Sequence, residues 1–253
     1  MTMLFKSKLD DTTVDSRWKS LCKIGGVAAI LIVVFSVIEV AIEASGGSGL
    51  TSTPSSVLEW FTLLQTNPLL GLAILGMFET IFFPLGVLMF MGLYFPLRRT
   101  SESLMAIGTA LYFIGTTIYF ASNNAFAMLN LSNQYAMATS EVQKSMLLAA
   151  GQAVMATEQG TGMIMTFILG SLAGIIVSIV MLRSKTFSKP VAIVGIVANV
   201  FGLFGSSLGL AVWTINGLLM MVWTLMVGRR LLQISRSQPK VKMLADKNAN
   251  LEA

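Results

Sequence analysis

The chain has 253 residues, of which 55% are hydrophobic and only 11% charged, and its formal net charge is +5. Since a soluble domain carries roughly 25% charged residues, this composition is typical of a membrane protein. The chain contains no histidine and one cysteine, Cys22. It therefore cannot form an intrachain disulfide, a histidine-ligated zinc or haem site, or a Ser-His-Asp or Cys-His catalytic group. We expect no metal site and no cofactor.

Six windows of the sequence are apolar over about 20 residues, the length that a helix needs to cross a bilayer. None of them alternates in polarity, so helices are predicted rather than barrel strands. The predicted spans cover residues 21–44, 69–97, 104–124, 162–182, 190–210 and 212–232. We expect an all-α polytopic membrane protein, with a cytoplasmic N-terminal segment at 1–20, a six-helix transmembrane domain at 21–232 and a cytoplasmic basic tail at 233–253.

The cations predict how the chain is threaded through the membrane. All of the 17 lysine and arginine residues except Lys144 lie before or at the start of the first span, between spans two and three, between four and five, or at the end of or after the sixth. By the positive-inside rule these segments and both termini are cytoplasmic, which requires an even number of spans. The basic tail is interpreted as a topology determinant at an anionic leaflet, with the lipid bilayer as partner, rather than as a nucleic-acid site.

The two long outer loops each contain a predicted short helix. Ser56 and Glu59 form a capping box before an apolar run in the first loop, and Ser140 and Gln143 form another in the second. We expect two amphipathic helices on the outer interface. They either order the loops at the lipid headgroups or form a lid over an outward-facing cavity.

The fourth predicted span carries a small side chain at every fourth position. In lipid, small residues allow two helix backbones to approach closely, so this pattern predicts a helix-packing face. We expect this span at the centre of the bundle with the fifth beside it, and a homodimer seam is the alternative. The residues of this small-residue stripe are Gly162, Thr166, Gly170, Gly174 and Ser178.

A single carboxylate interrupts the second predicted span. Glu79 lies about ten residues into it, hence roughly 15 Å deep, where an acid costs on the order of 3 kcal/mol on insertion scales. We therefore expect Glu79 to face the bundle interior or a wet cavity. Pro84 cannot donate to the carbonyl of Thr80, which predicts a bent helix with a polar notch at Thr80 and a gating kink at Pro84.

Other polar side chains are predicted at compatible depths in the outer half. If their faces converge, they form an acidic, amide-rich pocket that opens outward. Each also has a structural interpretation: the asparagines as hydrogen-bond partners between helices, and Glu43, which is four residues after Glu39, as an interfacial residue. Apart from Lys23, Arg229 and Arg230 at the predicted cytoplasmic ends of spans, no lysine or arginine lies within a span, so a proton or a small cation is favoured over a salt bridge. With Glu79, the candidate binding residues are Glu39, Asn123, Asn124, Asn199 and Asn216.

Residues 123–202 contain, in order, the words "LSNQYA", "LLAAGQA", "GTG" and "MLRSKTFSK". This segment resembles a widespread set of bacterial and archaeal multi-pass proteins, the family catalogued as domain of unknown function 4386. The resemblance implies a six-span protein in the plasma membrane of a prokaryote, without an established activity. It assigns no functional residue.

These observations favour a protein that binds or transports a small molecule or ion in an outward-facing cavity around Glu79. The alternative is a structural or accessory subunit of a larger membrane complex or homodimer, in which Asn199 or a partner satisfies Glu79. An intramembrane enzyme would need the carboxylates as acid and base, and no nucleophile motif accompanies them. We therefore expect no enzymatic activity.

Overall fold

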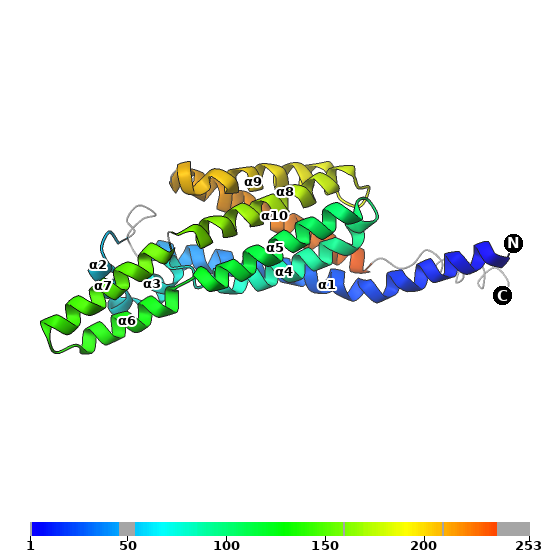
Figure 1. Cartoon of the computed structure of the whole chain (residues 1–253). Coiled ribbons are helices and arrows are strands. Elements are labelled where there is room, and N and C mark those ends of the chain that lie inside the picture. The colour runs from blue at the N-terminus through cyan, green and yellow to red at the C-terminus, as the bar shows by residue number, and fades with distance from the viewer. Residues whose placement is uncertain (1, 46–53, 159, 209, 237–253) are drawn as a thin grey trace.

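The computed structural model describes residues 2–45, 54–158, 160–208 and 210–236, and the regular structure of these residues is entirely helical. The predicted all-α class is confirmed. The helices in Figure 1 are α1 Thr2–Ser45, α2 Val57–Thr66, α3 Pro68–Ile74, α4 Glu79–Arg98, α5 Glu102–Ser122, α6 Ala125–Met137, α7 Glu141–Glu158, α8 Thr161–Arg183, α9 Lys189–Leu208 and α10 Leu210–Arg236. The predicted tail at 233–253 lies mostly outside the described residues.

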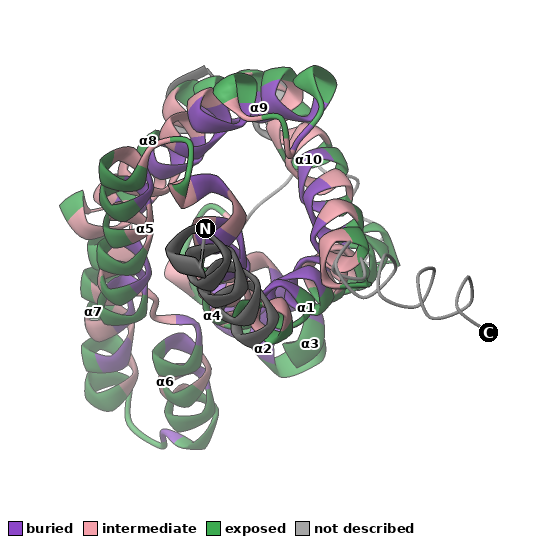
Figure 2. Ribbon diagram, turned by 90° about the vertical axis from the view of Figure 1, so that its right-hand side faces the viewer, coloured by how far each residue is buried: buried purple, intermediate pink, exposed green. Residues whose placement is uncertain are grey.

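Six of these helices form a ring. α1 packs on α4, α4 on α5, α5 on α8, α8 on α9, α9 on α10, and α10 returns to α1. Figure 2 looks along this ring and shows α8 and α9 on the side opposite α1. The prediction that the fourth span lies at the centre of the bundle is wrong, because α8 is one wall of the ring between α5 and α9.

The small-residue stripe explains why α8 occupies a wall. Gly162 contacts Ser122 of α5, whereas Gly174 contacts Asn199 of α9. The stripe therefore serves two different neighbours along its length. The main packing partners of α8 are α5 and α9, so it can lie in the wall of the ring without being enclosed.

Ring helices approach each other closely at several glycines. A Cβ atom at Gly25 of α1 would lie 2.8 Å from the carbonyl oxygen of Leu88 and 2.9 Å from Cα of Gly92, both in α4. A Cβ atom at Gly228 of α10 would lie 2.9 Å from Cβ of Ala29 in α1. Contacts of this kind are typical of helix pairs that associate within lipid, where dispersion replaces the hydrophobic effect.

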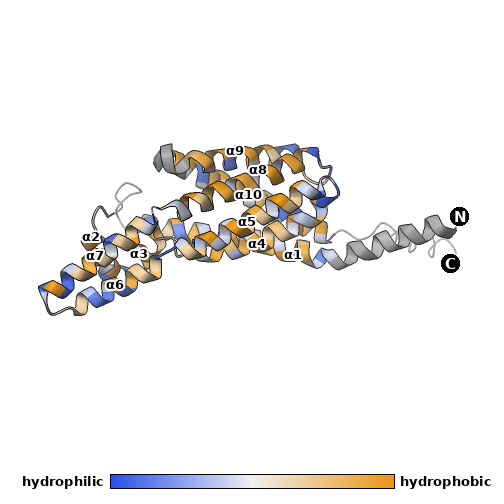
Figure 3. Ribbon diagram, viewed as in Figure 1, coloured by the Kyte–Doolittle hydropathy of each residue, from blue (hydrophilic) through white to orange (hydrophobic). Residues whose placement is uncertain are grey.

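The polarity of the ring is the reverse of that of a soluble protein. Large apolar side chains point outward, as at Val37, Ile114 and Val222, which are 57%, 51% and 49% exposed. Polar side chains are buried instead, among them Thr166 and Asn199. Figure 3 shows the apolar colour along the ring helices and the hydrophilic colour at their turns. Contiguous apolar surface on this scale is characteristic of proteins that face lipid.

Five stretches of the described residues are long and apolar enough to cross a membrane. The apolar helix at Lys189–Phe204 is shorter. It corresponds to the fifth of the six predicted spans, so the number six stays a prediction. The five stretches are Trp18–Ser45, Glu79–Arg98, Glu102–Met137, Glu141–Arg183 and Thr214–Arg236.

The basic residues of the ring gather at one end, which we call the basic end. Figure 1 shows the α4–α5 and α8–α9 turns and the end of α10 there. The guanidinium of Arg98 lies 5.6 Å from the ring centroid of Trp18 and 5.1 Å from that of Phe95. Arg230 donates from Nε to the carbonyl of Thr186 at 2.7 Å. Those basic residues of the ring helices and turns that the structure describes therefore lie at one end, and the orientation of the chain in the membrane stays a prediction.

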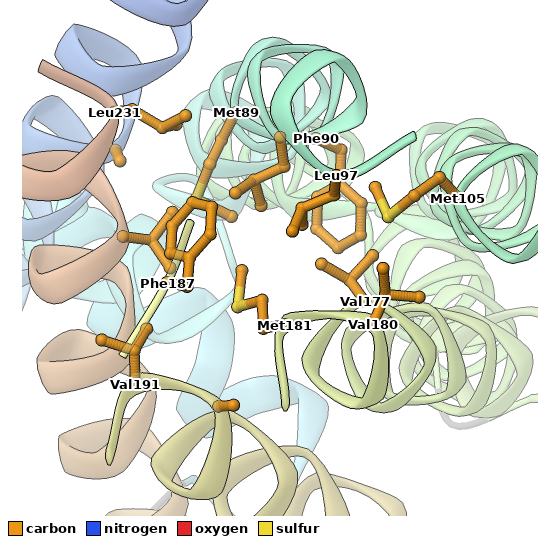
Figure 4. Packing of buried hydrophobic residues seen from close by; sticks show 14 of the residues in the cluster. Met89, Phe90, Leu97, Met105, Val177, Val180, Met181, Phe187, Val191 and Leu231 are labelled. Carbon is orange, nitrogen blue, oxygen red and sulfur yellow. The ribbon is translucent and has the colours of Figure 1, made fainter. Parts of the chain in front are cut away.

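A hydrophobic cluster fills the interior of the ring on the side of the basic end (Figure 4). We call it the apolar plug. All six ring helices contribute to it, so it closes the ring at this end. Its buried residues are Cys22, Ala29, Met89, Phe90, Leu93, Phe95, Leu97, Met105, Ala173, Val177, Val180, Met181, Phe187, Val191, Ala192, Trp223, Val227 and Leu231.

The remaining helices, α2, α3, α6 and α7, form a cap at the opposite end of the ring, which we call the cap end (Figure 1). The cap has its own hydrophobic cluster, in which Trp60, Phe61 and Leu64 of α2 pack near Met128 of α6. Ser132 of α6 donates to the carbonyl of Phe61 at 3.0 Å. The two elements are thereby held together by both apolar and polar contacts.

Both predicted capping boxes begin a helix of the cap. Glu59 N donates to Ser56 Oγ at 3.2 Å, and Gln143 N donates to Ser140 Oγ at the same distance. Hydrogen bonds from the backbone and hydroxyl of Ser55 lower the pKa of the Glu59 carboxyl. However, α2 buries its apolar face against α6 and does not lie as an isolated interfacial helix. Helix α6 was not predicted.

Candidate functional site

The backbone is interrupted where the second span was predicted to be continuous. Helix α3 ends at Ile74, a turn covers residues 75–78, and α4 begins at Glu79. Gly76 has φ of +81° in this turn, a left-handed conformation that glycine adopts without a steric penalty. The sequence prediction placed the distortion at Pro84, but α4 continues through Pro84 to Arg98. The missing N–H of Pro84 affects one bond near the start of the helix, so the helix persists.

Two side chains of α5 satisfy the carbonyls that the interruption frees. Tyr119 donates from its hydroxyl to the carbonyl of Gly76 at 2.7 Å. Asn123 donates from Nδ2 to the carbonyl of Leu75 at 3.0 Å and also contacts the Tyr119 oxygen at 2.9 Å. A turn inside an apolar helical stretch is stable only when its backbone groups find such partners.

The interruption changes the position of Glu79. It is the first residue of α4, and the turn before it contacts Tyr119 and Asn123 at the cap end of α5. Glu79 therefore lies toward the cap end of the ring, at the start of α4 and not midway along an unbroken helix as the sequence predicted. Its Oε2 atom is buried and has no hydrogen-bond partner among the described residues. A carboxylate oxygen in that condition is unfavourable unless a proton or a cation accompanies it.

A cavity of about 750 Å³ lies within the ring beside Glu79. Phe90 and Trp223, both members of the apolar plug, line its deep side. Glu43 near the end of α1 and Glu158 at the end of α7 line it toward the cap. The cavity therefore extends from the plug toward the cap end of the ring.

Four carboxylates line this cavity: Glu39 and Glu43 from α1, Glu79 from α4 and Glu158 from α7. None of its described lining residues is a lysine or an arginine. The Oε2 atom of Glu158, like that of Glu79, is buried without a hydrogen-bond partner among the described residues. The wall is consequently rich in carboxyl groups, and no described lysine or arginine of the lining is there to pair with them.

One side of the cavity is an aromatic wall made by α4 and α5. Phe83 stacks on Tyr119 with 4.3 Å between ring centroids, and Phe90 stacks on Tyr112 at 4.1 Å. Phe83 also contacts Tyr112 at 6.3 Å, which joins the two stacks. All four rings line the cavity. The wall therefore connects the apolar plug to the turn beside Glu79.

The structure brings together most of the polar residues that the sequence singled out. Glu39, Glu79, Asn123, Asn199 and Asn216 all line the cavity. The asparagines also have structural bonds, because Asn199 Nδ2 donates to Gly195 O at 2.7 Å and Asn216 Nδ2 to Ala198 O at 2.6 Å. Asn199 thus gives its donor to its own helix rather than to Glu79.

Two predicted site residues do not line the cavity. Thr80 donates from its hydroxyl to the carbonyl of Met77 at 2.6 Å, and Asn124 donates from Nδ2 to the carbonyl of Ser122 at 2.8 Å. Both side chains complete local turns. Within the small-residue stripe, Gly170 does not pack against another helix. It lines the cavity, and a Cβ atom there would have no neighbour within 4 Å.

Sequence reasoning missed the aromatic wall and the role of Glu158. Phe83 and Phe90 lie seven residues apart, as do Tyr112 and Tyr119, so each pair occupies one helix face. That spacing was a usable signal. Glu158 carries no comparable signal, because only the fold of the cap places it beside residues of α1 and α4. No group of three or more Cys, Asp or Glu side chains in the described chain is placed to hold a metal ion.

Comparisons of the chain with protein-family models, with curated proteins and with solved structures found no match. The likeness to the family catalogued as domain of unknown function 4386 therefore stays a prediction from the sequence.

Proposed function

We propose that this chain is a multi-pass integral membrane protein that binds a cation in the cavity at the cap end of its ring. The observation that carries the proposal is the cavity wall: four glutamates line it, no described lysine or arginine does, and the Oε2 atoms of Glu79 and Glu158 are buried without partners. A bound cation or a proton would supply the missing partner, since an unpaired buried charge is costly.

The ring supports a membrane location with six spans. Five stretches are long and apolar enough to cross a membrane, and α9 packs between α8 and α10 as a member of the same ring. We take α9 as the sixth span on this ground. The gathering of basic residues at one end favours that end as the cytoplasmic one, in the plasma membrane of a prokaryote, and the cap would then lie outside.

The contrast between the two ends favours a transport step after binding. The apolar plug closes the ring at the basic end, whereas the cavity reaches toward the cap end. This is the arrangement of a carrier that faces outward. Discontinuous helices, such as α3 and α4 around Gly76, recur at the binding sites of secondary transporters. The gate proposed at Pro84 from the sequence would then act together with the turn at Gly76.

A second function, an accessory subunit or homodimer, has one observation in its favour. Met137, Val142 and Met146 of the cap are 72%, 70% and 69% exposed, and a partner subunit or a lipid surface could cover them. The version in which Asn199 satisfies Glu79 loses support, because Asn199 Nδ2 donates to the carbonyl of Gly195 and Oε2 of Glu79 has no hydrogen-bond partner among the described residues. This alternative would need a partner to reach the cavity.

The cation proposal is tested by thermal unfolding of purified protein in detergent, with alkali, alkaline-earth and small ammonium cations. A ligand at about 100 times its Kd stabilises the folded state by roughly 2.7 kcal/mol. We expect one cation to raise the Tm of the wild type and of Glu102→Gln, a matched control at the basic end. We expect Glu79→Gln to abolish the shift.

Acidification should oppose the same shift, because protons compete with the cation for the carboxylates. The titratable groups that line the cavity with Glu79 are Glu39, Glu43, Glu158, Tyr112 and Tyr119. The series is therefore measured between about pH 5 and about pH 9, across which a buried carboxyl can titrate. If the three proteins melt alike under every condition, the cation site is rejected and capture of partner subunits becomes the next experiment.

A further inference from the structure

The volume of the cavity bears on the kind of cation that it holds. A cavity of about 750 Å³ lies within the roughly 300 to 1,000 Å³ that is typical of sites for drug-sized molecules. A dehydrated inorganic ion would occupy only a small part of it. The shape of the site therefore favours a ligand with a sizeable organic body.

The chemistry of the lining points in the same direction. Besides the carboxylates and amides, the lining includes seven aromatic and four methionine side chains, among them Phe82, Met163, Met220 and Met221. Methionine is flexible and polarizable and adapts to apolar ligands of varied shape. Such a lining offers dispersion contacts that a hydrated metal ion cannot use.

The aromatic wall adds an attraction that is specific for positive charge. Phe83, Tyr119, Phe90 and Tyr112 form two stacked pairs with centroid distances of 4.3 and 4.1 Å. A cation near the face of such a ring gains roughly 0.5 to 2 kcal/mol. Quaternary and other organic cations exploit this interaction because they are weakly hydrated.

The carboxylates and the residues of the apolar plug lie at different ends of the cavity. Glu43 and Glu158 lie toward the cap end, Glu79 lies at the turn, and Phe90 and Trp223 lie against the plug. From this segregation, which rests on the proposed function of the cavity, we propose that the ligand is a lipophilic organic monocation. Its charge lies among the glutamates and its apolar body against the aromatic wall.

Tetraphenylphosphonium and tetraphenylborate provide a matched pair of probes, because they have nearly the same size and shape and opposite charges. Binding to the full chain is measured by isothermal titration in detergent, with a micelle blank. We expect saturable binding of the phosphonium at one site and none of the borate. Equal binding of both ions would indicate nonspecific partitioning and would overturn the ligand class.

Single substitutions separate the contribution of the carboxylates to phosphonium binding from that of the aromatic wall. We expect Glu79→Gln to weaken phosphonium binding roughly tenfold or more, as the loss of a carboxylate partner in a partly desolvated site implies. Phe83→Leu should weaken it by roughly threefold to thirtyfold through the lost cation–π contact. Phe113→Leu, on the outward face of α5 and 41% exposed, and Glu102→Gln are the controls and should leave it unchanged. If Glu79→Gln does not fold, Glu158→Gln tests the same charge.

The outcomes distinguish this inference from the function on which it rests. Binding of inorganic or small ammonium ions without binding of the phosphonium would reject the lipophilic ligand and leave the cation cavity standing. Binding of the phosphonium that is insensitive to both Glu79→Gln and Phe83→Leu would place it elsewhere and reject the inference. Absence of any cation effect would reject both.

Discussion

The two ends of the ring are built from the same helices but differ in how their interior is packed. At the basic end the interior is filled, and Leu93, Leu97 and Met105 are fully buried in the apolar plug. At the cap end the same helices enclose a cavity of about 750 Å³ with unpaired carboxylate oxygens in its wall. The residues that stabilise the ring and the residues that could bind a ligand therefore lie at different ends of the same helices. Packing is complete where it closes the ring and is absent where a ligand would enter.

The largest expected effect comes from deleting the same side-chain atoms at the two ends. Leu93→Ala removes a side chain with 0% exposure from the plug, and such changes cost about 2 to 5 kcal/mol of unfolding free energy. Leu218→Ala, in the cavity lining and 59% exposed, should cost well under about 1 kcal/mol. Thermal unfolding of the two variants checks the prediction. Equal losses of stability would show that the two ends are not packed differently.

A smaller contrast is expected within the small-residue stripe of α8. A Cβ atom at Gly174 would collide with the Asn199 side chain, whereas at Gly170 it would meet nothing within 4 Å. Gly174→Ala should therefore lower the free energy of unfolding by about 1 to 3 kcal/mol through overpacking. Gly170→Ala should raise it by roughly 0.5 to 1 kcal/mol, because alanine is the better helix former. Denaturant titrations of both variants measure the difference, and a destabilised Gly170→Ala would mean that the cavity wall is packed after all.

Much of the fold could be predicted from the sequence because lipid imposes a strong pattern. Apolar windows at 104–124 and 162–182 match α5, Glu102–Ser122, and α8, Thr161–Arg183, to within a few residues. The capping boxes likewise begin α2 and α7. These features are local, so composition and short spacing are sufficient to reveal them.

The features that failed depend on tertiary structure. Gly76 lies inside an apolar run, and its positive φ is held by Tyr119 and Asn123 from another helix, so hydropathy predicts an unbroken span. The convergence of Glu39, Glu79 and Asn199 on one cavity could only be proposed from depth, because the rotation of each helix is set by its neighbours. The ring was missed for the same reason: small residues predict contact but not with how many partners.

The central claim, a negatively charged cavity that ligands can enter, is tested most directly with a thiol introduced at Gly170. This position lines the cavity and has room for a side chain. With Cys22→Ser to remove the native thiol, Gly170→Cys is treated in detergent with a trimethylammonium-ethyl thiosulfonate and with a sulfonate-ethyl thiosulfonate. Ser145→Cys, at an exposed position of α7, gives the intrinsic ratio of the two reagents.

We expect the thiol of Gly170→Cys to react roughly tenfold or more faster with the cationic reagent than with the anionic one, relative to the thiol of Ser145→Cys, since a charged cleft concentrates ions of opposite sign. Adding Glu79→Gln should reduce that preference. If the thiol of Gly170→Cys reacts with neither reagent, ligands cannot enter the cavity. If it reacts with both at the ratio found for Ser145→Cys, the cavity is not negatively charged.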